Sequence, residues 1–384
     1  MALYLALKEL WRNRGRFLLF SLVIALITTL VLFTAALGEG LGLGNREYIE
    51  KLNADVLVYK ANVDLNISAS RIERLRLNEI RRVAGVQDAG AIGVASASLV
   101  QAGDRKLNIA LIGVEPGRPG EPPVMSGQGL ETRRRRDAII DRNAALRTGL
   151  NVGDEFRIRS IQGTREEFYT LRVSGISDGR QFFLQPAVFV PLASWDVLKP
   201  GGVADGSSGG DSSANVVAAQ GAPGVSAAEL KARLEREVPG IQAAGLQTAY
   251  EAAPGYTAQQ STLGTQRAFV FLIGMLVIGG FFQIQTLQKA AQIGMLKAIG
   301  AGNGIIVLAA VTQIVLVMAI GVALGSAGTL LLSLSFPPTI PIVFTGNAVV
   351  VSIISLMLIG PLGGLVSLRY SLRIEPLTAL GLGA

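Results

Sequence analysis

Residues 298–368, AIGAGNGIIVLAAVTQIVLVMAIGVALGSAGTLLLSLSFPPTIPIVFTGNAVVVSIISLMLIGPLGGLVSL, decide the fold, because these 71 consecutive residues include no Asp, Glu, Lys or Arg. A helix of about 20 apolar residues crosses a hydrocarbon core of about 30 Å. The stretch is therefore long enough for two crossings, and Pro337, Pro338 and Pro341 predict the turn between them. We expect two membrane spans, at 304–334 and 347–368, joined by an external turn at 335–346.

Two shorter charge-free stretches predict two further spans. Residues 17–38 and 268–288 contain 22 and 21 residues without a charged side chain, which gives spans at 17–41 and 267–288. The first stretch is longer than the apolar core of about 7–15 residues in a signal peptide, so an uncleaved span is favoured over a cleaved signal. The fold class is thus a membrane protein of four transmembrane α-helices, with a large extracytoplasmic α+β domain at 42–266 between the first and second.

The net charge of +7 predicts the topology. Ten charged residues lie on the side of the spans that holds both termini and the segment between the second and third spans, and they carry a net +6, whereas residues 39–267 carry only +1. The basic residues among the ten are Lys8, Arg12, Arg14, Arg16, Lys289, Lys297, Arg369 and Arg373. Basic residues favour the cytoplasmic side, so we expect cytoplasmic termini, with an interfacial helix at 1–16 and a tail at 369–384. The excess charge lies beside the bilayer, and nucleic acid is not an expected partner.

The 42–266 domain alternates short strands and helices. Strands are expected at 91–100 and 106–114 as one hairpin and at 155–161 and 167–176 as another. A helix is expected at 71–83, with Ile72, Leu75, Ile80 and Val83 facing inward. The Gly- and Ser-rich segment 201–213 reads as a linker, which divides the domain into lobes at about 42–200 and 214–262. The glycine-rich segment 38–44 is expected to be a flexible exit from the bilayer.

Several functions are disfavoured by what the sequence lacks. It has no Cys and no His, so disulfides, His-based catalytic triads and the usual zinc sites are excluded. It has no Gly-Lys pair and hence no ATP-binding phosphate loop, and no catalytic residue, metal site or covalently bound cofactor is predicted. The charge-free stretches 268–288 and 298–368 contain no ionisable residue, which disfavours an ion-coupled transporter. Gly321, Gly325 and Gly328 predict close helix contact, and the arginines at 133–136 predict a solvated loop or a site for an anionic partner.

Particular segments resemble the FtsX/MacB-like class of ABC transporter permeases. These are Leu7-Lys8-Glu9-Leu10-x-Arg12-Asn13-x-x-Arg16, Ile140-Asp141 followed by Leu150-x-Val152-Gly153-Asp154, Gln288-Lys289-x-x-Gln292-Ile293-Gly294-Met295-Leu296-Lys297, and Ile374-Glu375-Pro376-Leu377. The resemblance implies a multi-pass permease of the bacterial inner or plasma membrane, which is not itself an enzyme. It implies a homodimer with a second permease and two cytoplasmic ATPase subunits that bind the ATP.

The resemblance also implies a coupling segment at 289–303 that receives motion from the ATPase. Its expected contact residues are Lys289, Gln292, Ile293, Gly294, Leu296 and Lys297. An ordinary basic loop between two spans is the alternative interpretation.

A narrower similarity is to the HrtB-like haem-export permeases and the DevC-type permeases. Its residues are Asn45-x-x-x-Ile49, Ala54-Asp55, Leu65-x-x-Ser68 and Pro254-Gly255-Tyr256-x-x-Gln259. It implies export of an amphipathic molecule such as haem, with Tyr250, Glu251 and Tyr256 as candidate substrate ligands beside the second span. These aromatic residues could equally anchor the chain at the membrane interface. The alternatives are export of another lipid, glycolipid or drug, and a signalling permease that controls an extracytoplasmic cell-wall enzyme.

Overall fold

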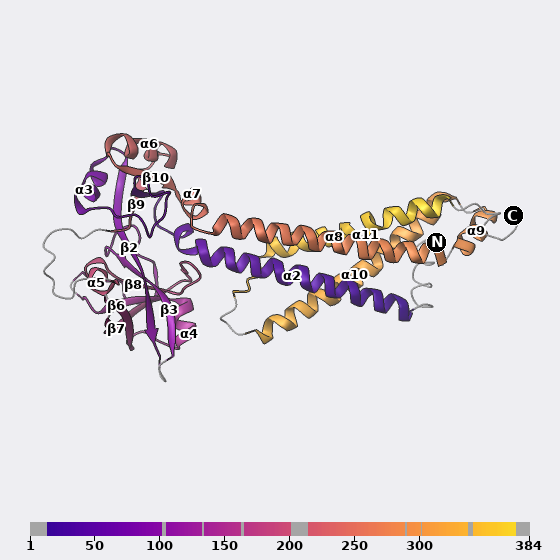
Figure 1. Ribbon diagram of the computed structural model, residues 1–384, viewed down its shortest axis with the longest axis horizontal. Helices are drawn as coiled ribbons and strands as arrows, with labels where there is room; N and C mark the ends of the chain where they lie inside the picture. The colour runs from indigo at the N-terminus through magenta and orange to yellow at the C-terminus, as the bar shows by residue number, and fades with distance from the viewer. Residues whose placement is uncertain are drawn as a thin grey trace. The chain divides into compact units, whose positions relative to one another are not determined.

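The computed structural model describes residues 14–101, 105–132, 134–162, 165–200, 214–288, 290–300, 302–336 and 341–373. The chain divides into two units (Figure 1). The membrane unit comprises Met1–Gly40 and Gln260–Ala384, and the α+β domain comprises Leu41–Gln259.

Four helices of the described residues are long and apolar enough to cross a membrane, as the sequence predicts. They are α2 (Arg14–Glu50), α8 (Tyr256–Gln288), α10 (Asn303–Ser335) and α11 (Gly346–Arg373), and the short α9 (Ala290–Ala298) lies between α8 and α10 in the chain. Residues 1–13, 337–340 and 374–384 lie outside the described residues. They include most of the expected interfacial helix, part of the expected turn and most of the expected tail.

Small residues bring α10 against α2 within the membrane unit. A Cβ added at Gly321 would lie 2.5 Å from the Cγ2 of Ile24, and one at Gly325 would lie 2.5 Å from the carbonyl oxygen of Ala25. The Thr29 hydroxyl donates a hydrogen bond to the Gly325 carbonyl at 3.1 Å. The prediction of close helix contact at these glycines is confirmed, and its partner is α2.

The expected flexible exit at 38–44 was wrong, because α2 continues without a break to Glu50. Glycine in a helix interior costs roughly 1 kcal/mol relative to alanine, and close approach explains why it is tolerated here. A Cβ at Gly40 would overlap the Pro341 carbonyl oxygen, and one at Gly44 would lie 2.5 Å from the Leu184 side chain. The glycine pattern therefore marks contacts along a helix.

The α+β domain contains one ten-stranded sheet in the order β10-β1-β9-β2-β3-β8-β5-β7-β4, with β6 paired to β2 and β7. The strands are β1 (Val56–Lys60), β2 (Val86–Val100), β3 (Lys106–Val114), β4 (Val124–Gly127), β5 (Asp137–Asp141), β6 (Glu155–Gln162), β7 (Arg165–Ser177), β8 (Ala187–Pro191), β9 (Val216–Gly221) and β10 (Ile241–Gly245). The two expected hairpins are present as β2–β3 and β6–β7.

The long strand β2 joins two parts of the sheet. Its first half pairs with β9, whereas its second half pairs with β3 and β6. From there the pairings run β2-β3-β8-β5-β7-β6 and return to β2, which closes six strands into a ring. The ring shares a buried cluster with α4 (Arg142–Thr148) and α5 (Leu192–Leu198), and this cluster includes Phe156, Leu171 and Trp195.

Two further hydrophobic cores lie on opposite faces of β1. Val56 and Val58 of β1 face a cluster that includes Leu77 and Ile80 of α3 (Arg74–Arg82) and Leu230 and Leu234 of α6 (Ala227–Glu237). The alternate residues Leu57 and Tyr59 face a second cluster with Tyr48, Ile49 and Leu52, at and just after the end of α2, as the two-residue period of a strand requires. The end of α2 is therefore part of the domain core.

Two predictions about this domain were wrong. Residues 214–262 are not a separate lobe, because β9 and β10 both pair with β1 and β9 also pairs with β2. The linker 201–213 lies outside the described residues. Leu75 does not face inward: its side chain is 65% exposed. Helix α3 begins only at Arg74, and its inward face carries Leu77 and Ile80, three residues apart.

Candidate functional site

The structure brings together the two tyrosines that were predicted as substrate ligands. Tyr250 is the last residue but one of α7 (Leu246–Glu251), and Tyr256 is the first residue of α8. Their ring centroids lie 5.7 Å apart with an edge-to-face angle of 70°. The intervening turn requires Gly255, whose φ of +81° lies in the left-handed region.

The two rings differ in their surroundings. Tyr256 is 9% exposed, and Tyr250 is half-buried against the core cluster of Tyr48 and Leu57. Burial raises the pKa of the Tyr250 phenol, and the neighbouring Tyr256 adds to this effect. Glu251 is exposed and accepts a hydrogen bond from the Gln247 amide at 2.9 Å. The three residues thus form one patch in which only Glu251 is freely exposed.

Two residues quoted for the narrower family similarity meet beside this patch. The Asn45 side-chain amide donates a hydrogen bond to the Gln259 side-chain oxygen at 2.8 Å. Asn45 lies on α2 and Gln259 lies on the first turn of α8, so this bond joins the two helices within the α+β domain.

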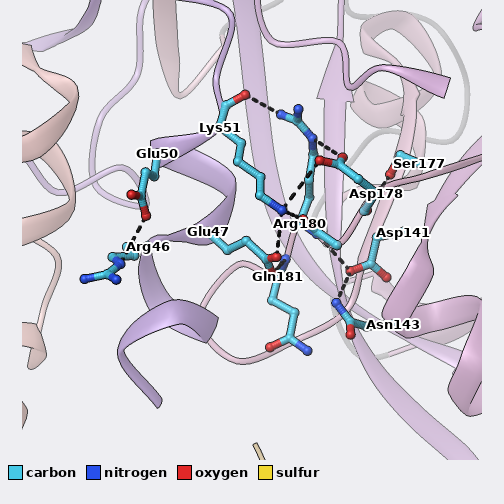
Figure 2. Close-up of polar contacts among 11 residues, drawn as sticks. Arg46, Glu47, Glu50, Lys51, Asp141, Asn143, Ser177, Asp178, Arg180 and Gln181 are labelled. Atoms are coloured by element: carbon cyan, nitrogen blue, oxygen red, sulfur yellow. Dashed lines mark hydrogen bonds and ion pairs between the residues drawn. The ribbon is translucent and has the colours of Figure 1, made fainter. Parts of the chain in front are cut away.

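A polar network that we call the α2 clamp fixes the last turn of α2 to the segment 178–181 (Figure 2). The Lys51 ammonium group donates to the Glu47 carboxylate at 2.9 Å and to the Gly179 carbonyl at 2.6 Å. The second Glu47 oxygen accepts from the Gln181 backbone N–H at 3.1 Å. Figure 2 shows these side chains directed from the helix toward the loop.

Arg180 is the most buried charged group of the α2 clamp, at 5% exposure. Its Nε donates to the Asp178 carboxylate at 2.7 Å, and its Nη1 donates to the Lys51 carbonyl at 2.6 Å. A buried guanidinium that is paired and hydrogen-bonded holds its partners in one geometry, and removal of it leaves those partners unpaired. Three and four residues after Arg180, Phe183 and Leu184 have positive φ values of 48° and 62°, which a side-chain-bearing residue rarely adopts.

Asp141 lies next to the α2 clamp and contacts the backbone of Arg180. It caps α4 by accepting the Ala144 N–H at 2.6 Å, and its other oxygen accepts from Asn143 and from the Arg180 N–H. Burial raises the pKa of Asp141 to about 6, although these hydrogen bonds act in the opposite direction. Ile140-Asp141 was quoted only for its family resemblance, and the structure gives the carboxylate a structural role.

The predicted coupling residues lie on α9, except Lys289, which directly precedes the helix in the chain. Gln292 is exposed, Ile293 and Lys297 are half-buried, and Gly294 is buried. Lys289 and the side chain of Leu296 lie outside what the structure describes. The most exposed apolar side chains here are Met295 at 55% and Ile299 at 78%. Met295 lies on α9, and Ile299 directly follows its last residue, Ala298.

The sequence interpretation missed the α2 clamp. Arg46–Glu50 and Glu47–Lys51 are ion pairs at helical spacing, a pattern that could have extended the predicted helix beyond residue 41. No sequence pattern links them to Arg180. Among the described residues, no group of three or more carboxylates is placed to hold a metal ion.

Comparisons with known proteins cover both units. Residues 17–237, more than half of the chain, match the family described as the MacB-like periplasmic core domain. Residues 268–376 match the FtsX-like permease C-terminal family.

Two relatives of known sequence span nearly the whole chain. A permease named HrtB, assigned by that name to a hemin transport system of Staphylococcus haemolyticus, is 22% identical over 98% of this chain and 99% of its own. An uncharacterised ABC transporter permease of Mycobacterium bovis is 24% identical over 99% of each chain. Among solved structures, the periplasmic region of MacB from Actinobacillus actinomycetemcomitans covers 51% of this chain and 90% of its own, at 13% identity and a TM-score of 0.36.

Proposed function

Since this chain belongs to the FtsX/MacB-like family of ABC transporter permeases, we propose that it transmits ATP-driven motion along α2 to an external domain and thereby exports an amphipathic molecule, with haem as the first candidate. The permease itself hydrolyses no ATP, and separate ATPase subunits are its partners. A homodimer with two such subunits is the arrangement that we propose.

The observation that carries this proposal is the continuity of α2 and the way its end is held. The helix is unbroken from Arg14 to Glu50, and the α2 clamp fixes its last turn through Glu47, Lys51 and Arg180. An unbroken helix that is fixed at its end moves as a rigid element. Displacement of its cytoplasmic end would therefore reach segment 178–181.

The exposed face of α9 supports contact with an ATPase on the cytoplasmic side. Met295 on α9 and Ile299 just after it present apolar surface, and Lys297 lies in the last turn of the helix. We propose that α9 receives the motion and that α8, which precedes it, and α10, which follows it, pass the motion into the bilayer.

Our proposal that haem is the exported substrate is supported by the name of the relative HrtB and by the Tyr250–Tyr256 pair. Without His or Cys, the iron ligand would be a phenolate, a carboxylate or a methionine. The raised pKa of Tyr250 opposes formation of its phenolate, which counts against Tyr250 as the iron ligand. Export of another lipid, glycolipid or drug is the alternative.

Transport and hydrolysis in vesicles test this function. The permease is reconstituted with its ATPase, and ATP-dependent movement of haem is measured beside ATP hydrolysis. Arg180→Ala should reduce haem movement severalfold while hydrolysis continues, because the α2 clamp is lost. Arg233→Gln breaks an exposed ion pair with Glu229 on α6 and serves as the matched control. Equal transport by both variants would contradict transmission through the α2 clamp.

Binding of haem is tested separately. The purified permease should shift the absorption band of haem without its ATPase. Tyr256→Phe or Glu251→Gln should abolish the shift if either residue ligates iron, whereas Tyr250→Phe should retain most of it. If the native protein shifts no haem band in detergent or in lipid, haem is excluded as the substrate.

A signalling permease is the competing function. It would hydrolyse ATP with its partner but move neither haem nor another amphiphile in these vesicles. Deletion of its gene would then alter an external cell-wall enzyme and leave sensitivity to haem unchanged.

A further inference from the structure

A cavity of about 200 Å³ lies inside the membrane unit between α2, α8 and α11. Its walls are mostly apolar, and Val31, Phe271 and Val351 represent the three helices. The hollow is partly open, and its apolar walls lose contact energy unless another apolar group packs against them. The cavity is therefore a candidate for occupation by an apolar ligand group.

Among the described residues that line this cavity, Arg267 is the one ionisable residue. Its Nε is shielded from solvent and has no hydrogen-bond partner in the described part of the chain. Its Nη2 reaches only the Ala35 carbonyl, at 3.5 Å. The structure records no ion pair for Arg267 among the residues it describes. Arg267 is half-buried, and a partly buried guanidinium gains from a counter-ion, so the geometry favours an anion beside it.

The position of Arg267 along the helices indicates where that anion comes from. Arg267 directly precedes the charge-free stretch 268–288 of α8. Its contacts on α2, Ala35 and Gly38, end the charge-free stretch 17–38. Both helices therefore place the guanidinium at the border of the hydrocarbon region, where basic groups attract anionic lipid headgroups.

The size of the cavity indicates which part of the ligand enters it. Pockets that enclose a whole drug-sized ligand measure about 300–1,000 Å³, so this smaller cavity accommodates only a portion of a larger molecule. A section of one acyl chain matches both its volume and its apolar walls. Ser352 and Ser355 of α11 add hydroxyl groups to the lining.

We propose that this cavity binds an anionic phospholipid, with the phosphate paired to Arg267 and part of one acyl chain lying between α2, α8 and α11. The inference is independent of whether haem is the exported substrate. Because Val31, Thr34 and Ala35 of α2 line the cavity, the lipid is a structural partner of the helix to which we assign motion transmission.

The test compares lipids that differ only in headgroup. Purified full-length permease in detergent is titrated with phosphatidylglycerol or with the diacylglycerol of the same chains, which has no phosphate, and bound lipid is counted by native mass spectrometry. Phosphatidylglycerol should bind at least about tenfold more tightly, the effect of one charge-assisted hydrogen-bonded contact. Equal binding of the two lipids would overturn the proposal without any variant.

Variants then locate the site. Arg267→Gln should remove the preference for phosphatidylglycerol, and Arg267→Lys should retain much of it. Arg14→Gln makes the same charge change at the opposite end of α2 and should leave the preference intact. If Arg14→Gln lowers it as much as Arg267→Gln does, the lipid is attracted by net charge alone and the site is wrong.

Two further experiments distinguish binding of the acyl chain from binding of the headgroup. Ser355→Leu fills the cavity but keeps Arg267, and it should weaken binding of phosphatidylglycerol. Soluble glycerol phosphate, which has the phosphate and no chain, should not displace the bound lipid at equal concentration. Displacement by glycerol phosphate, together with normal binding by Ser355→Leu, would show that only an anion site exists and that the cavity holds no acyl chain.

Discussion

At the scale of single residues, the α2 clamp depends on charges that are held out of water. Arg180 and Asp141 are 5% and 0% exposed, and each is surrounded by several hydrogen-bond partners. Because such groups are costly when unpaired, they fix the loop 178–181 in one arrangement against α2. The titration of Asp141 makes that arrangement sensitive to pH.

Asp141 predicts a pH-dependent stability of the α+β domain. The folded domain holds the Asp141 proton up to about pH 6, because burial raises that pKa from the ordinary value of 3.8. Between these pH values the folded state binds more protons than the unfolded chain. The stability contributed by this group is therefore complete below pH 3.8 and is lost as pH rises through about 6, by roughly 3 kcal/mol in total.

Unfolding followed by Trp195 fluorescence in a Trp11→Phe background measures this effect. Trp195 is buried in the ring core, in the same cluster as Ile140. Asp141→Asn should flatten the change in thermal midpoint between pH 4.5 and pH 7. Asp154→Asn alters an exposed carboxylate of the same domain and should leave the slope of the parent protein. Parallel slopes for all three proteins would contradict the titration of Asp141.

At the scale of elements, α2 depends on glycine for two kinds of contact. Gly321 and Gly325 let α10 approach it within the membrane unit, while its own Gly40 and Gly44 let other backbone and side-chain atoms approach. Membrane helices gain little from burial of apolar surface against one another, so close contact of this kind provides much of their association.

Gly325→Leu should therefore destabilise the membrane unit. The new side chain would meet the Ala25 carbonyl and Thr28 at 2.5 Å, and overfilling of this kind typically costs about 1–3 kcal/mol. The thermal midpoint in detergent should fall by several degrees. Gly280→Leu on α8 is the control, since nothing lies within 4 Å of its Cβ position. A similar midpoint for both variants would place the stabilising contacts elsewhere.

Substitutions in α9 should lower ATP hydrolysis, because we propose that this helix contacts the ATPase. Gly294→Leu and Lys297→Glu should each reduce ATP hydrolysis of the assembled complex severalfold, since the first adds volume and the second reverses a charge on a nine-residue helix. Arg236→Glu, on the exposed surface of α6, should have no effect. Normal hydrolysis in both α9 variants, with the complex intact, would assign the contact to another segment.

At the scale of the whole molecule, the sequence predicted those features that depend on residues close together in the chain. Four spans, both hairpins and the glycine contacts of α10 follow from charge-free length, alternation and small-residue spacing. The lobe division failed because β1 pairs with strands that follow it by more than 150 residues in the chain. The α2 clamp was missed for the same reason: the bond from Arg180 to the Lys51 carbonyl joins residues 129 positions apart.

The distribution of charge predicts the orientation of the whole chain. Residues that flank the spans on the side of both termini carry a net +6 and the α+β domain region only +1, so the domain should be external and both termini cytoplasmic. Reporter fusions at residue 210 should be active outside the cell, and fusions at 293 and 384 should be active inside. Residues 210 and 384 lie outside the described part of the chain, but each still reports the side on which its segment ends. A cytoplasmic signal at 210 would reverse the transmission that we propose, because α9 would then face away from ATP. It would also move the Arg267 cavity to the cytoplasmic border of the bilayer, where the same preference for an anionic lipid would still be expected.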